Sequence, residues 1–102
     1  MMQIYYSGVD ADIPIDKAIE MKRFVYKFTQ ENHFPRDATM LITVKHYPGY
    51  GWGRMYAVHC KLYNHHYLST DGLNKNLIGA AKEALKRMQS RMAVYERPIE
   101  GF

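Results

Sequence analysis

Basic side chains near the end of the chain are spaced so that they could bind phosphate. Across residues 73–95, apolar residues recur every three or four positions, and this period predicts an amphipathic helix. The basic residues of this predicted helix lie on the two flanks of its apolar stripe, with Lys75, Lys82 and Lys86 on one flank and Arg87 and Arg91 on the other. Such an array can neutralise a nucleic-acid backbone and release its counterions. The alternative interpretation is a solvated helix face that binds nothing.

A second predicted helix, residues 15–31, adds further basic side chains. Arg23 and Lys27, four residues apart, are expected to face outward, and Lys22 is a further candidate contact. The positions that we expect to face inward include Ile15, Ala18, Ile19, Val25 and Phe28. Asp12 or Pro14 can start this helix. If both helices cover the same face of a sheet, their cations form one surface.

The segment from residue 47 to residue 54 places aromatic rings beside further cations. It holds three glycines, one proline and three aromatic residues, and this composition predicts a loop between two strands. The candidate contacts here are Lys45, Tyr50, Trp52 and Arg54. Exposed rings next to cations can stack on unpaired bases. The rings could equally fold back onto the sheet, and the sequence leaves both interpretations open.

Histidines and the single cysteine suggest a metal site at first, but their spacing argues against one. His59 and Cys60 are neighbours on a predicted strand and therefore point to opposite faces. His65 and His66 fall at a turn, and no pair has the spacing of a zinc finger or of an HExxH helix. No serine lies in a nucleophile-elbow motif. We therefore expect no metal, no cofactor, no small-molecule substrate and no enzymatic activity.

Apolar periodicity and turn residues predict the elements that carry these candidates. Strands are predicted at residues 3–7, 38–46, 55–63 and 66–70, and helices at 15–31 and 73–95, the second capped by Thr70 or Asp71. The strand residues expected on the core face are Met40, Ile42, Val44, Tyr56, Val58, Cys60 and Leu62. The order β-α-β-β-β-α predicts an α+β fold, a four-stranded sheet with two helices packed on one face, as in double-stranded-RNA-binding domains.

The composition of the chain limits its domain number, its charge and the class of protein to which it can belong. The chain has 102 residues, and we expect one domain over residues 1–96 with a short tail at 97–102. Fourteen Lys and Arg against ten Asp and Glu give a net charge of +4, which favours an anionic partner without requiring one. A lone Cys60 fits a reducing compartment. No apolar run has transmembrane length and the start lacks signal-peptide character, so we expect a cytoplasmic protein that does not bind membranes.

Several stretches resemble the ribosome hibernation-promoting factors, also called ribosome-associated factor Y or the sigma-54 modulation family. Residues 2–8 (MQIYYSG) are similar to the family's first strand, and Lys27-Phe28 is similar to a step at the end of its first helix. Residues 57–73 are similar to the family's last hairpin, including the stretch Ser69-x-Asp71-Gly72 at its end. The chain departs from the family after that glycine, where it has Leu73-Asn74-Lys75-Asn76, and in its less basic helix end.

The resemblance implies a non-enzymatic factor that binds the small ribosomal subunit, in the channel for mRNA and tRNA, and blocks translation under stress. Our leading hypothesis is therefore that rRNA phosphates contact Lys27, Lys75, Lys82, Lys86, Arg87 and Arg91, with Lys22 and Arg23 in support. Two alternatives remain open: a double-stranded-RNA-binding-like module acting on another RNA, and a protein-interaction module that forms a homodimer.

Overall fold

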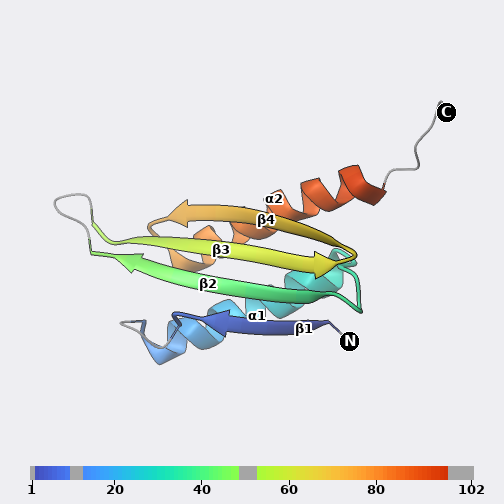
Figure 1. The fold of residues 1–102 in the computed structure, drawn as a ribbon. Helices are drawn as coiled ribbons and strands as arrows, with labels where there is room; N and C mark the ends of the chain where they lie inside the picture. The colour runs from blue at the N-terminus through green and yellow to red at the C-terminus, as the bar shows by residue number, and fades with distance from the viewer. Residues whose placement is uncertain (1, 10–12, 49–52, 97–102) are drawn as a thin grey trace.

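The computed structural model describes residues 2–9, 13–48 and 53–96, which form a four-stranded mixed sheet and two helices (Figure 1). The elements in chain order are β1 (Gln3–Ser7), α1 (Ile15–Glu31), β2 (Thr39–Tyr47), β3 (Met55–Asn64), β4 (His66–Asn74) and α2 (Leu77–Glu96). This confirms the predicted α+β fold and its order β-α-β-β-β-α. The expected tail, residues 97–102, and the loop positions Tyr50 and Trp52 lie outside the described residues.

The strands follow one another across the sheet in the order β1-β2-β3-β4. β1 is parallel to β2 because α1 carries the chain back between them, whereas β2, β3 and β4 pair antiparallel as successive hairpins. Alternate residues of β2 and β3 are buried against the helices, including Met40, Ile42 and Cys60. The predicted core face of these two strands is therefore confirmed.

Both helices lie on one face of the sheet and run in the same direction, and Figure 1 shows them behind the strands. α1 buries Ala18, Met21, Val25 and Thr29, which recur at steps of three and four. The prediction that Ile15 and Ile19 face inward is wrong, since they are 79% and 46% exposed. Successive helical residues are about 100° apart around the axis, so Ile19 turns away from the stripe that starts at Ala18.

The boundary between β4 and α2 also differs from the prediction. The strand continues to Asn74 instead of ending at Thr70, so Leu73 pairs with Ala57 in the sheet and is 56% exposed. The helix begins at Leu77, and neither Thr70 nor Asp71 caps it. Instead the side-chain oxygen of Asn76 accepts hydrogen bonds from the backbone N–H groups of Ile78 and Gly79 at 2.9 and 3.3 Å.

The difference results from the pairing of β4 with β3 and from its packing against α2. The apolar period of residues 73–95 can extend a helix back to Leu73, but Leu73 and Asn74 pair instead with Ala57 and Tyr56 of β3, which continues the sheet ladder. Gly72 permits this course because a Cβ atom there would lie 2.0 Å from the Ala80 carbonyl oxygen of α2. Strand and helix thus pass each other too closely for any residue with a side chain.

No helix among the described residues is both long and apolar enough to cross a membrane.

Candidate nucleic-acid interface

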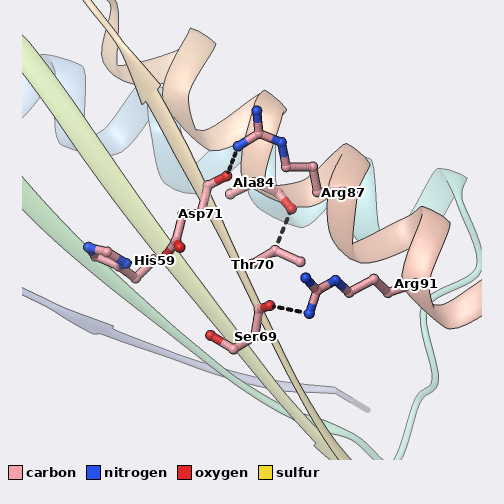
Figure 2. A network of polar contacts seen from close by, with 7 residues as sticks. All are labelled: His59, Ser69, Thr70, Asp71, Ala84, Arg87 and Arg91. Carbon is pink, nitrogen blue, oxygen red and sulfur yellow. Dashed lines mark hydrogen bonds and ion pairs between the residues drawn. The ribbon is translucent and has the colours of Figure 1, made fainter.

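Two arginines of α2 are held against β4, the strand at the edge of the sheet. Arg91 donates through Nη1 to the Ser69 carbonyl oxygen at 2.9 Å, and Arg87 donates through Nη1 to the carbonyl oxygen of Asp71 (Figure 2). These oxygens belong to alternate residues of an edge strand, whose outer carbonyls have no further strand to pair with. The two guanidinium groups are therefore ordered by the fold, and each keeps other N–H groups that can donate elsewhere.

A shallow open hollow of about 400 Å³ lies between these arginines and the strand. Its lining residues come from β4 and α2 and are Ser69, Thr70, Asp71, Arg87, Ser90 and Arg91. The Asp71 carboxylate turns away from the arginines and pairs with His59 of β3. The hollow therefore has two ordered guanidinium groups at its wall, and guanidinium donors are groups that bind phosphate oxygens.

A hydrogen bond from Thr70 also joins β4 to α2 on this flank. The Thr70 hydroxyl is buried and donates to the Ala84 carbonyl oxygen of α2 at 2.7 Å (Figure 2). This bond joins strand and helix between the two arginine contacts, so that Arg87 and Arg91 start from a helix held at a set distance from β4. A rigid scaffold lowers the entropy that side chains lose on binding.

The opposite flank of α2 carries freer charges. Lys82 and Lys86 are exposed, and no hydrogen bond or ion pair within residues 13–48 and 53–94 engages either ammonium group. Lys75 does not continue this row, as the helical prediction required, because it lies in the turn before α2. α2 therefore carries four of the predicted cations, two of them hydrogen-bonded to β4 and two exposed to solvent.

The basic residues of α1 are partly engaged. The Lys22 ammonium lies 5.2 Å from the centre of the Tyr6 ring, and Lys27 is 3.9 Å from the Glu31 carboxylate on the exposed side of the helix. Arg23 is exposed. Exposed pairs of this kind contribute little free energy and dissociate readily, so Lys27 remains available to an anionic partner.

The two helices are linked, which places their cations on the same side of the molecule. Gln89 of α2 donates through Nε2 to the side-chain oxygen of Asn32, the residue that ends α1, at 2.9 Å. The candidate loop contacts do not join this surface. Lys45 lies on the sheet face that the helices leave open, and Arg54 is exposed just before β3.

Sequence reasoning missed one group of residues, the tyrosines on this open sheet face. Tyr63 and Tyr67 are directly paired across β3 and β4, their ring centres are 5.1 Å apart, and both are about half exposed. Tyr5 of β1 is exposed on the same face. The alternation of Tyr5 with Ile4 and Tyr6 was a signal for an outward ring, but the register that joins Tyr63 to Tyr67 was not visible in the chain.

The histidines and the cysteine separate as predicted. His59 lies on the open face with Asp71, whereas Cys60 is fully buried on the core face. Within the described parts of the chain, no three His, Cys, Asp or Glu side chains converge on one point.

With this geometry in view, the fold can be compared with known proteins. No family model matches the chain, and no curated protein matches its sequence. Among solved structures, it is similar to a ribosomal subunit interface protein from Coxiella burnetii. That likeness has a TM-score of 0.61 and covers 93% of this chain and 96% of that chain, at 9% sequence identity. At so low an identity the two share a fold along almost their whole length.

Proposed function

We propose that this protein is a ribosome-associated factor that binds rRNA of the small subunit through the helix side of the molecule. In this proposal it occupies the decoding channel, excludes mRNA and tRNA, and so keeps idle ribosomes inactive. The observation that carries the proposal is the set of four cations on α2, two of them ordered against β4 and two exposed on its other flank. The likeness to a ribosomal subunit interface protein supports the same partner.

The arrangement suits folded RNA better than a particular base sequence. Arg87 and Arg91 offer planar donors that match phosphate oxygens, and Lys82 and Lys86 offer point charges on flexible stems. Contacts of both kinds reach the backbone and carry no sequence information. Recognition would therefore depend on whether rRNA places its phosphates where the helices present cations, and this is recognition by shape.

The partner can be tested by pelleting purified protein with small subunits, large subunits and a long RNA duplex. We expect co-sedimentation with small subunits, and loss of binding when mRNA and tRNA already fill the decoding channel. Equal binding to tRNA-filled and empty subunits would exclude the channel. Binding to the duplex as tight as to small subunits would favour the double-stranded-RNA-binding-like alternative.

The contribution of the helix surface is best tested with its free lysines. We expect the double variant Lys82→Gln/Lys86→Gln to bind more weakly. Each lost phosphate contact should reduce the magnitude of the slope of log K against log salt concentration by about one, so the slope should be smaller by about two. Thermal stability should be unchanged, because both side chains are exposed and unpaired among the described residues. Filter binding at several salt concentrations measures both quantities.

A charge-matched control is the variant Lys17→Gln/Arg36→Gln, which removes two exposed cations that are not among the proposed contacts. We expect this control to keep the salt slope of the parent. If both double variants lose binding equally, net charge alone attracts the RNA and α2 has no special part in it.

A further inference from the structure

The sheet has one face without helices, and this face carries aromatic rings and cations together. Both helices pack on the other side, and Figure 1 shows the open face turned toward the viewer. Tyr5, Tyr63 and Tyr67 lie on this face and are 53%, 48% and 53% exposed. Folded proteins usually bury more of such rings, and a group of exposed rings on a flat sheet is typical of an interaction surface.

Register places a cation between the rings. Lys61 of β3 pairs with Leu41 of β2, which in turn pairs with Tyr5 of β1. Tyr63 is two residues further along the same strand as Lys61, and therefore on the same face, beside Tyr67 of β4. Tyr5 thus lies two strands, or about 10 Å, to one side of Lys61, with Leu41 between them. Tyr63 follows along the strand of Lys61, and Tyr67 lies beside Tyr63 on the far side from Tyr5.

The charge of the face is positive. Lys45 and Lys61 both lie on it, and Asp71, its acidic residue within the described strands, is already paired with His59. An acidic protein could form ion pairs with the two lysines, but its carboxylates would not stack on the tyrosine rings. A second copy of the chain would place like charges opposite each other, which is unfavourable.

The centre of the face also argues against a protein partner. Protein interfaces are depleted of charged residues at their buried centre, whereas here Lys61 lies centrally, with Ser69 on one side and Leu41 on the other. Rings that alternate with cations are the means by which proteins hold unpaired bases, since every base can stack and every nucleotide brings a phosphate.

We propose that the open sheet face binds single-stranded RNA, with bases stacked on Tyr5, Tyr63 and Tyr67 and a phosphate on Lys61. This site lies on the opposite side of the sheet from the helix surface and does not depend on the ribosomal proposal. The Tyr63 and Tyr67 rings are tilted by 47° to each other and both are about half exposed, so each has surface that a base can contact.

The test uses a fluorescent twelve-nucleotide RNA without secondary structure and the same RNA annealed to its complement, with binding followed by anisotropy. The double variant Tyr63→Leu/Tyr67→Leu keeps apolar side chains at both positions but removes the rings. We expect it to lose about tenfold or more in affinity for the single strand per stacked ring, and to bind the duplex as the parent does. Tyr63→Phe/Tyr67→Phe should retain the affinity, because the ring and not the hydroxyl stacks.

A matched control is Tyr26→Leu, which removes a ring of the same exposure, 50%, from α1 on the other side of the molecule. It should leave single-strand binding unchanged. Equal single-strand affinity in the parent and the Tyr63→Leu/Tyr67→Leu variant would overturn the proposal. So would a parent that sediments as a dimer and becomes monomeric in that variant, because the face would then belong to a second copy of the chain.

Discussion

At the scale of single residues, position in the packed molecule changes what a side chain can do. Arg87 and Lys86 are adjacent in sequence and both exposed, yet the arginine is held by a β4 carbonyl oxygen and the lysine has no such partner. Replacing Arg87 therefore removes a contact within the fold as well as a charge. The lysines are the better positions for separating binding from stability.

Cys60 shows the effect of burial on chemistry. Burial raises the pKa of its thiol from 9.0 to about 12, because the thiolate would lose its hydration inside the core. A neutral buried thiol is a poor nucleophile and behaves as a small apolar side chain. Tyr6 follows the same trend, since burial and the neighbouring Cys60 raise its pKa from 10.0 to about 12.

These pKa values predict a loss of stability at alkaline pH. A group whose pKa is higher in the folded than in the unfolded protein contributes to the free energy of unfolding. This contribution is complete at pH values below the unfolded pKa, and it is lost as the pH rises toward the folded pKa. For Cys60 the window runs from 9.0 to about 12. Urea denaturation at about pH 8 and about pH 10.5 should show a fall in the free energy of unfolding that is smaller in Cys60→Ala than in the parent. An equal fall in both proteins would mean that Cys60 is not protected from ionisation in the fold.

At the scale of elements, the contact between β4 and α2 positions Arg87 and Arg91. Gly72 lies where the two elements approach most closely, and a Cβ there would be 2.0 Å from the Ala80 carbonyl oxygen and 2.8 Å from the Ala84 nitrogen. Both atoms belong to the backbone and cannot turn aside. The hydrogen bonds from Thr70, Arg87 and Arg91 all cross this contact.

We therefore predict that Gly72→Ala lowers the free energy of unfolding by about 3 kcal/mol, the upper range for overpacking a core. Gly79→Ala is the matched control, because the atoms nearest to its added Cβ belong to the side chain of Asn74, which can shift where a backbone cannot. The substitution also gains helix propensity of about 1 kcal/mol. Urea denaturation should give near-parent stability for the control. A stable Gly72→Ala protein would show that α2 can move away from β4 without loss.

At the scale of the whole molecule, the sheet separates two charged surfaces. The helix side presents Lys82 and Lys86, and the open face presents Lys61 with the tyrosines. Because neither surface shares a residue with the other, a protein of this size could hold folded RNA on one side and an unpaired strand on the other.

This separation predicts independent effects. Substitutions about 10 Å or more apart without shared partners add to within about 0.5 kcal/mol. The loss of single-strand affinity in Tyr63→Leu/Tyr67→Leu should therefore be the same in the parent and in the Lys82→Gln/Lys86→Gln background. Anisotropy titrations of the four proteins give the coupling free energy. A coupling well above that limit would show that one RNA path crosses both surfaces.

Local patterns in the sequence were enough to predict most of the elements. The bounds of β1 and α1 agree with the prediction, and Met40, Ile42 and Val44 occupy the core face that their alternation indicated. These features depend on the period of a strand or helix and on turn residues, and such signals are contained within a few neighbouring positions. The amphipathic helix that carries Lys82, Lys86, Arg87 and Arg91 was visible for the same reason.

Only the tertiary structure decided where β4 ends, what the arginines contact, and which rings meet. Leu73 fits a helical stripe as well as a strand, and its pairing with β3 selects the strand. The contacts of Arg87 and Arg91 with β4, and the meeting of Tyr63 and Tyr67, depend on packing and register between separate elements. A period within one segment describes the faces of that segment, but it contains no information about the element that will lie against them.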